Sequence, residues 1–228
     1  MIERQYRVDG ITILSDAGLE AMPDADWFRP QWWSDRAAVI DELGGRGTAL
    51  ALETPLGPAV LRRFRRGGLF ASMLGDRYLG LAADRSRAFR EFRLLGRLAD
   101  MRLPVPAPLA ASFEPAGPVY RAGLLTRLIP NATQLADAAA TLPEETWRGL
   151  GATLERCFRA GLHHPDLNAR NILLDGHGRW YLLDLDRARV LDRRVPREAM
   201  LRRLARSLAK TADEGWQSGF RALIDQLD

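Results

Sequence analysis

Cysteine is nearly absent from the sequence, and this restricts the sites that the chain can build. Cys157 is the one cysteine in 228 residues, so no disulfide can form within the chain. Proteins of reducing compartments have this composition, and we expect a cytoplasmic location. No group of Cys and His residues has the spacing of zinc ligands, so no zinc site is predicted.

Long apolar runs are missing as well. No stretch approaches the ~20 consecutive apolar residues that are needed to span a bilayer. The first residues, MIER, lack the positively charged segment and apolar core of a secretory signal. Because 46% of the residues are nevertheless hydrophobic, we expect them to fill the core of one globular domain or of two small lobes.

The charge balance points to an anionic partner. Lys and Arg number 33 against 29 Asp and Glu, and almost all of the positive charge is Arg. The planar fork of donors on Arg suits phosphate oxygens, so an anionic substrate or surface is expected. No nucleic-acid module and no regular alternation of aromatic and basic residues is present, and we therefore expect no nucleic acid as partner. The sequence indicates no protein partner either.

The amino-terminal half predicts a small antiparallel sheet followed by one helix. Residues 44–64 alternate short β-prone runs with glycine and proline turns, a pattern typical of a meander. Residues 84–100 carry apolar side chains at helical spacing, and prolines in residues 104–108 end the helix. The apolar run of residues 123–129 predicts a buried strand, which Pro130 interrupts.

The carboxy-terminal half predicts mainly helices. Residues 144–160 carry an apolar face, and Thr141 stands three residues before Glu144, as in a capping box. Pro196 opens a second helix, and apolar residues from Trp216 onward mark a last one.

Residues 163–174 form the most specific segment. They read HHPDLNARNILL and match the kinase catalytic-loop pattern H-x-D-L-x-x-x-N followed by an apolar strand. In this pattern Asp166 is the catalytic base and Asn171 is a metal ligand. Phosphoryl transfer needs little covalent chemistry from the protein, so a carboxylate that orients the acceptor hydroxyl and oxygen ligands for magnesium do most of the work. The segment therefore predicts a phosphotransferase that uses ATP and Mg²⁺.

The next motif follows from hairpin geometry. Two β-prone runs lie between Asn171 and Asp184, joined by the turn sequence DGHGR. A turn centred between His177 and Gly178 would place Asn171 opposite Asp184. Asp184 would then lie a few ångströms from Asp166, where protein kinases carry the metal-binding Asp-Phe-Gly motif.

Each of these side chains alone is better explained by an ordinary loop. Asp166 and Asn171 could cap a turn, and Asp184 and Asp186 could be solvated carboxylates. Their combination at these spacings, flanked by apolar strands, favours a phosphotransferase site.

These motifs indicate an α+β, protein-kinase-like two-lobe fold. We expect a single domain over residues 1–228, with a small N-terminal sheet and one helix in residues 1–129. Residues 130–228 would form a reduced, mainly helical C-terminal lobe.

The nucleotide site is expected in the amino-terminal half. Gly45 and Gly47 would let a strand turn approach phosphates with its N–H donors, although such glycines serve ordinary hairpins as often. Arg62 occupies the position of the phosphate-binding lysine of kinases, and Arg63 competes for this role if the strand register shifts by one. Glu91 lies on the apolar stripe of its helix, where a carboxylate needs a partner, and we expect it to pair with Arg62. The alternatives are solvated strand charges and a glutamate at the edge of the stripe.

The acceptor is predicted to be a small molecule or glycolipid. The 44 residues after Asp184 contain neither an activation segment nor an A-P-E pattern, which protein kinases use to dock peptides. The basic stretches at residues 61–70 and 193–210 could instead contact acceptor phosphates or an anionic lipid surface. The alternative is that they only form a solvent-exposed face that keeps the protein soluble.

Taken together, these segments resemble the 3-deoxy-D-manno-octulosonic acid (Kdo) kinases of the lipopolysaccharide kinase family. The blocks that carry the resemblance span residues 44–208: Gly44-Gly45-Arg46-Gly47-Thr48, Leu61-Arg62, Arg66-Gly67-Gly68-Leu69, Glu91-Phe92, Leu94-Leu95, Leu103-Pro104-Val105-Pro106, residues 164–175, Asp184-x-Asp186-Arg187 and Leu201-x-Arg203-Leu204-x-Arg206-Ser207-Leu208.

The resemblance implies transfer of the γ-phosphate of ATP to the 4-hydroxyl of Kdo on a lipid A precursor. It further implies a peripheral location at the anionic cytoplasmic face of the bacterial inner membrane. By motif, Asp166 matches the catalytic aspartate, and Asn171 and Asp184 match the metal ligands. The alternatives are a lipopolysaccharide heptose kinase, a cytosolic antibiotic-type kinase and, more remotely, a pseudokinase scaffold.

Overall fold

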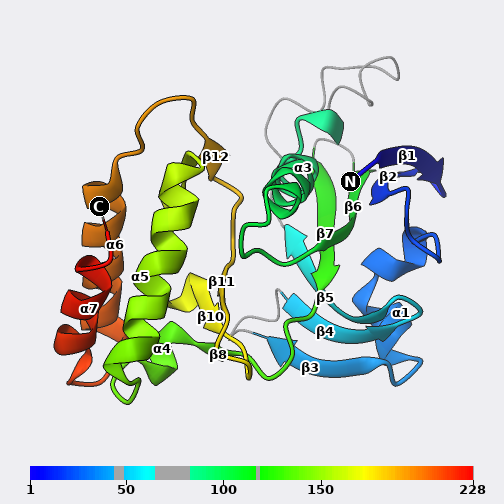
Figure 1. The fold of residues 1–228 in the computed structure, drawn as a ribbon. Coiled ribbons are helices and arrows are strands. Elements are labelled where there is room, and N and C mark those ends of the chain that lie inside the picture. Colours follow the sequence, from blue (N-terminus) through cyan, green and yellow to red (C-terminus); the bar gives the residue numbers. More distant parts are fainter. Residues whose placement is uncertain (44–48, 65–82, 117–118, 228) are drawn as a thin grey trace. The chain divides into compact units, whose positions relative to one another are not determined.

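The computed structural model describes residues 1–43, 49–64, 83–116 and 119–227 (Figure 1). Their contacts divide the chain into two compact units. Unit 1 comprises residues 1–97 and 107–128, and unit 2 comprises residues 98–106 and 129–228.

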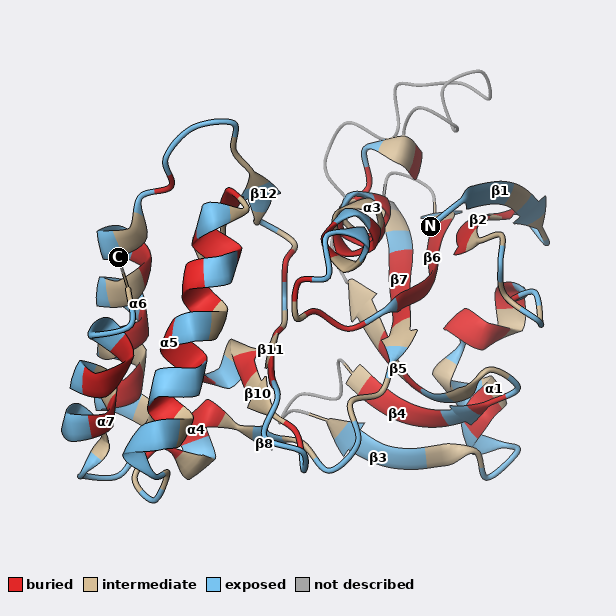
Figure 2. Cartoon of the chain, viewed as in Figure 1, coloured by how far each residue is buried: buried red, intermediate tan, exposed pale blue. Residues whose placement is uncertain are grey.

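Unit 1 is built on a seven-stranded antiparallel sheet with the order β1-β2-β6-β7-β5-β4-β3. The strands are β1 (Glu3–Val8), β2 (Ile11–Asp16), β3 (Val39–Leu43), β4 (Ala49–Thr54), β5 (Gly57–Phe64), β6 (Pro108–Ala116) and β7 (Val119–Arg127). Buried residues concentrate on the inner strands, whereas β1 and β3 at the two edges are mostly exposed (Figure 2). The sheet is larger than we predicted, because β1, β2 and β6 were not expected, although Asp9-Gly10 between β1 and β2 is a hairpin-turn signal.

The described residues of unit 1 also form short helices and the larger part of one long helix. They are η1 (Ala25–Phe28), α1 (Pro30–Ser34) and α3 (Arg87–Asp100). Trp27 and Trp33 pack edge to face at a centroid distance of 5.6 Å and join a core with Leu52 and Leu61 of the sheet. The predicted helix at residues 84–100 is present as α3, although it begins at Arg87.

Unit 2 combines small sheets with helices. A three-stranded sheet has the order β11-β10-β8, and β9 pairs with β12. The strands are β8 (Thr133–Gln134), β9 (Leu162–His163), β10 (Ile172–Leu174), β11 (Trp180–Leu182) and β12 (Arg189–Val190). The helices are α4 (Leu135–Ala138), α5 (Glu144–Arg159), η4 (Ala169–Asn171), α6 (Arg197–Thr211) and α7 (Trp216–Ile224). The chain thus has a mixed α/β fold with a large antiparallel sheet.

Helices α5 and α7 approach each other closely through glycine. A Cβ atom at Gly151 of α5 would lie 2.4 Å from the main-chain oxygen of Leu223. A Cβ atom at Gly219 of α7 would lie 2.1 Å from Nε1 of Trp147. Both distances are far below van der Waals contact. The absence of a side chain at Gly151 and at Gly219 therefore allows the close approach of α5 and α7. Cys157, also in α5, is 1% exposed, and burial raises its pKa to about 12.

The predicted capping box before α5 is wrong. The N-cap residue is Pro143, and no side chain caps this end. The Thr141 hydroxyl instead donates to the main-chain oxygen of Ala138, at 3.2 Å. At this end of α5, the main-chain oxygen of Pro143 accepts hydrogen bonds from the N–H groups of Thr146 and Trp147.

Within the described ranges, every helix is too short or too polar to cross a bilayer.

Candidate active site

The segment between β9 and β10 holds Asp166 in a tightly bonded loop. The side-chain oxygen of Asn168 accepts the N–H groups of Arg170 and Asn171, which forms the cap of η4. Its Nδ2 donates to the main-chain oxygen of Asp166 at 2.8 Å, and Nδ2 of Asn171 donates to the same oxygen at 3.1 Å. The structure therefore brings Asp166 and Asn171 together, and Asn168 fixes the loop that joins them.

A buried histidine connects this loop to the segment that carries Asp184. His164 is 2% exposed, and its Nε2 lies 3.0 Å from the main-chain oxygen of Leu183. Because a carbonyl oxygen only accepts, Nε2 carries the proton. Burial lowers the pKa of His164, opposed by this hydrogen bond and by the negative charges of Asp184 and Asp166. His164 is thus a neutral structural link that the motif contained but the sequence analysis did not single out.

Asp184 follows directly on the end of the hairpin. The N–H of Leu183 donates to the main-chain oxygen of Asn171 at 2.8 Å, which places Asp184 next in line. Its φ of 56° lies in the left-handed region, which non-glycine residues seldom adopt. The chain turns sharply here, so Asp184 leaves the strand direction immediately after Leu183, the residue that is bonded to Asn171.

The hairpin register differs by one residue from the prediction. Ile172 pairs with Leu182, whereas we expected residue 183. The difference comes from Asp175, whose Oδ1 accepts the N–H groups of His177 and Arg179. Together with the bond from Gly178 N–H to the Asp175 oxygen, this makes a three-residue turn centred on His177. The predicted opposition of Asn171 and Asp184 is therefore wrong, although main-chain bonding keeps them adjacent.

Charge around Asp175 reinforces this turn. Burial works against ionisation of its carboxyl, but the hydrogen bonds from Arg179 and His177 outweigh burial and lower the pKa of Asp175. The Arg179 guanidinium donates to Oδ2 at 2.8 Å. The turn is thus held by an ionised, hydrogen-bonded carboxylate.

Two arginines contact the Asp166 carboxylate. Nη2 of Arg203, in α6, lies 2.8 Å from Oδ1, and Nη1 of Arg187 lies 3.6 Å from Oδ2. Helix α6 also contacts the loop through Ser207, whose Oγ accepts the N–H of Ala169 at 3.1 Å. From the sequence, Arg187 was expected only as part of a block of resemblance, and Arg203 also as part of the basic stretch at residues 193–210. Sequence distance hides their convergence, because Arg187 lies 21 residues and Arg203 lies 37 residues after Asp166.

The expected ion pair of the amino-terminal half is present in unit 1. Arg62 of β5 is paired with Glu91 of α3, and Glu91 is 3% exposed. Side chains alternate along a strand, so Arg63 points to the other face, where it lines a cavity with Phe28 and Gly123. Arg62 is therefore the cation that α3 positions, which favours the first of the two registers considered.

The glycines proposed for phosphate contact cannot be placed. Gly45 and Gly47 lie outside the described residues, as does most of the basic and aromatic stretch at residues 61–70.

The oxygen atoms of Asn171 and Asp184 near the end of the hairpin are of the kind that magnesium prefers. Nδ2 of Asn171 donates to the main-chain oxygen of Asp166, so its side-chain oxygen could bind a metal ion. Asp184 carries a carboxylate. Mg²⁺ is commonly bound by one or two such oxygens together with water and substrate phosphates. Among the residues that the structure describes, no group of three or more His, Cys, Asp or Glu side chains is placed to hold a metal.

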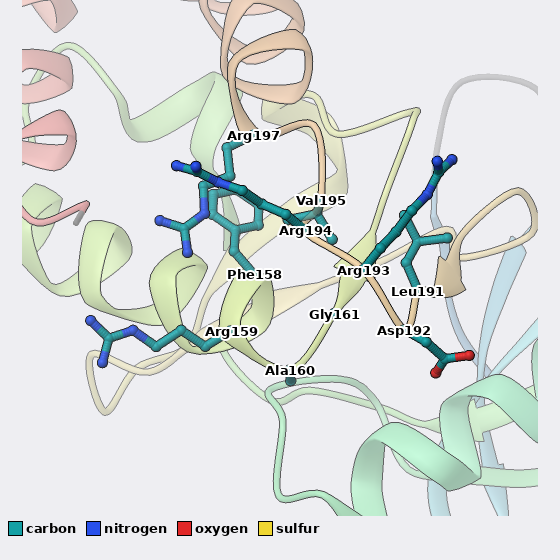
Figure 3. A pocket seen from close by; sticks show the side chains of 10 residues that line it. All are labelled: Phe158, Arg159, Ala160, Gly161, Leu191, Asp192, Arg193, Arg194, Val195 and Arg197. Atoms are coloured by element: carbon teal, nitrogen blue, oxygen red, sulfur yellow. The ribbon is translucent and has the colours of Figure 1, made fainter.

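A basic cavity of about 360 Å³ lies in unit 2 where α5 ends and the chain leads into α6 (Figure 3). Arg159, Arg193, Arg194 and Arg197 contribute to its walls. Arg159 and Arg197 are ion-paired with Glu155, which is 7% exposed.

A second basic cavity shares part of this lining. It includes Arg193, Arg194, Arg189 and His163. Burial lowers the pKa of His163, and the charges of Arg189 and Arg193 lower it further. His163 precedes Asp166 by three positions, so the lining of this basic cavity includes a residue close to Asp166 in sequence.

Comparison with known proteins shows the family to which the chain belongs. The model of the lipopolysaccharide kinase (Kdo/WaaP) family matches residues 30–221. The chain belongs to this family. The matched range includes both the Arg62–Glu91 pair and the whole segment from His163 to Asp184.

Curated relatives support the same assignment. A protein of Stenotrophomonas maltophilia named 3-deoxy-D-manno-octulosonic acid kinase is 44% identical over 207 residues, covering 89% of this chain and 82% of the relative. A protein of the same name from Xanthomonas oryzae pv. oryzae is 47% identical over 192 residues, covering 82% and 76%. One from Xanthomonas campestris pv. campestris is 46% identical over 203 residues, covering 87% and 80%. The resemblance seen in the sequence is thereby confirmed.

Proposed function

We propose that this chain is an ATP-dependent kinase that phosphorylates Kdo in lipopolysaccharide core biosynthesis, at the 4-hydroxyl of a Kdo residue on a lipid A precursor. The observation that carries the proposal is the similarity, at 44% to 47% identity over most of the chain, to proteins named for this activity. The loop geometry of Asp166 and Asn171 agrees with it.

Unit 2 would supply the reacting groups. Asp166 accepts the proton of the acceptor hydroxyl while the hydroxyl oxygen bonds to the γ-phosphorus of ATP. The bond from this phosphorus to the β,γ-bridging oxygen breaks, and ADP is released. Asn171 and Asp184 would hold magnesium. The bound ion neutralises the phosphate charge that opposes the attack.

Unit 1 would supply the nucleotide-binding residues. Arg62, oriented by Glu91, is suited to hold phosphate oxygens, and Gly45 and Gly47 would offer main-chain N–H groups. On this proposal the chain has a protein-kinase-like fold with residues 1–129 as one lobe and residues 130–228 as the other.

A membrane-bound acceptor requires access to an anionic surface. The two basic cavities, with Arg189, Arg193 and Arg194, are suited to anionic headgroups or glycolipid phosphates. We therefore place the enzyme peripherally at the cytoplasmic face of the inner membrane.

A transfer assay tests the proposal. The protein would be given labelled ATP, magnesium and lipid A precursor with or without Kdo, beside a heptose-bearing acceptor and an antibiotic panel. Label only on the Kdo-bearing lipid is expected. Label only on heptose or an antibiotic would overturn the acceptor assignment. Asp166→Ala and Asp184→Ala should each abolish transfer while circular dichroism and the melting temperature stay close to those of the parent protein.

A further inference from the structure

Asp166 is surrounded by more positive charge than its own ionisation requires. Arg203 approaches Oδ1 at 2.8 Å from α6, and Arg187 approaches Oδ2 at 3.6 Å from the segment between β11 and β12. One carboxylate with two guanidinium groups leaves a net charge of +1 among the three side chains. One arginine would already balance the carboxylate, so the second is surplus.

Both arginines have donors to spare. A guanidinium carries five N–H donors. The 3.6 Å separation between Arg187 and Asp166 is too long for a hydrogen bond. Neither Arg187 nor Arg203 has a further hydrogen-bond or ion-pair partner among the described residues, and their side chains are 69% and 44% exposed. Several N–H groups therefore point to solvent beside the reacting carboxylate.

The arrangement also distinguishes the two oxygens of Asp166. Oδ1 is taken up by Arg203, whereas Oδ2 accepts no hydrogen bond from the described residues. Oδ2 is the oxygen available to an acceptor hydroxyl. Any group next to that hydroxyl then lies beside Arg187 and Arg203.

We propose that Arg187 and Arg203 bind the carboxylate of the acceptor sugar while Oδ2 of Asp166 receives the proton of its hydroxyl. This inference rests on the proposed function. In a 3-deoxy-2-ulosonic acid, the carboxylate is attached to the ring carbon two positions from the carbon that bears the 4-hydroxyl. The carboxylate and the 4-hydroxyl are thus close enough to be bound at the same time by the two arginines and by Asp166, which lie beside one another. Guanidinium pairs with carboxylate in a charged, bidentate geometry, and the surplus positive charge is balanced when the acid binds.

Acceptor choice follows from this arrangement. A neutral sugar such as heptose would leave the two guanidinium groups uncompensated, and transfer to it would be disfavoured. The arginine pair thus selects an acidic sugar, a task that Asp166, Asn171 and Asp184 cannot perform because kinases share them whatever the acceptor.

The test compares two acceptors in the same enzyme. One is the Kdo-bearing lipid A precursor, and the other is the same glycolipid with the sugar carboxylate converted to a primary amide of equal size. Because a hydrogen bond to a charged group contributes about 1.5–3 kcal/mol, wild-type kcat/KM should be about 10- to 100-fold lower on the amide. Arg203→Ala should lower kcat/KM by a similar factor on the carboxylate acceptor but very little on the amide. Arg187→Ala should show the same pattern.

Arg202→Ala provides a matched control. Arg202 lies on the same helix and is ion-paired with Glu198 at 3.1 Å, so its removal should change transfer to neither acceptor. Equal efficiency of the wild-type enzyme on both acceptors would overturn the inference without any variant. An equal loss on both acceptors in Arg203→Ala would also overturn it, because Arg203 would then act only by holding Asp166. Absence of transfer from wild-type enzyme to the unmodified glycolipid would instead contradict the proposed function.

Discussion

Glu91 in α3 is buried against Arg62 in β5, and the two form an ion pair. A carboxylate with 3% exposure is costly without a cationic partner. Arg62→Ala should therefore lower the free energy of unfolding by about 1–3 kcal/mol and raise the KM for ATP.

Glu91→Ala separates the two effects. It should also raise the KM for ATP, because Arg62 loses its orientation. The double variant Arg62→Ala/Glu91→Ala should be less unstable than the sum of the single changes, as measured by urea unfolding. Strict additivity would contradict an energetic coupling between them. Arg63→Ala, on the other face of the strand, should leave the KM for ATP unchanged.

The thiol of Cys157 should be unreactive in the folded protein. Burial raises its pKa to about 12 from an ordinary 9.0, so almost no thiolate exists at pH 8.5. A maleimide should label the chain only after denaturation, at one site, as followed by mass spectrometry.

The same shift predicts a fall in stability at alkaline pH. Between about pH 9 and 12 the unfolded thiol ionises and the buried one does not, so the unfolded state binds fewer protons and stability decreases as pH rises. Cys157→Ala should remove this component of the pH dependence. Rapid labelling of native protein would show that the thiol is not buried as described.

Gly149 and Gly151 offer a matched pair within α5. Alanine at Gly151 would place its Cβ 2.4 Å from the main-chain oxygen of Leu223, so α7 must move, and we expect a loss of about 1–3 kcal/mol. At Gly149 the nearest atom is 3.7 Å away, and alanine should stabilise the helix by up to about 1 kcal/mol. Thermal unfolding should thus shift in opposite directions. A parallel shift would mean that the close approach of the two helices does not limit stability.

The basic cavities should contribute to membrane binding. Arg193→Ala/Arg194→Ala should weaken binding to vesicles containing phosphatidylglycerol by about 2 kcal/mol, or roughly 30-fold, at low salt. The control variant Arg148→Ala/Arg202→Ala removes the same charge from arginines that are ion-paired with glutamates. Equal loss in both variants would indicate a general charge effect. Binding to neutral vesicles should be weak in all three proteins.

The sequence predicted the parts of the molecule that depend on local patterns. The stripe on α3 and the hairpin of β10 and β11 follow from spacing. The need of Glu91 for a cationic partner follows from the cost of burying an isolated charge, and the kinase motif indicated Arg62 as that partner. The register of the hairpin does not, because the side chain of Asp175 selects a three-residue turn and shifts every pair by one.

Other features depend on long-range contacts that the sequence pattern does not express. Arg203 is one of several arginines on α6, and only the folded chain distinguishes it by its contact with Asp166. Strands β1 and β2 were not predicted, although Asp9-Gly10 between them is a two-residue turn of the kind that joins hairpin strands, and the place of this hairpin in the sheet is set by the pairing of β2 with β6. Thr141 fits the capping pattern locally, but its hydroxyl is bound to Ala138.

The sheet of unit 1 ends in two strands that carry opposite kinds of charge. β3 displays Asp41 and Glu42, both exposed, whereas β1 displays Glu3 beside Arg4 and Arg7. Strand edges with unpaired N–H and C=O groups tend to pair between molecules, and charged side chains oppose this. Two acidic β3 edges would repel each other, which opposes pairing of one β3 edge with another between molecules.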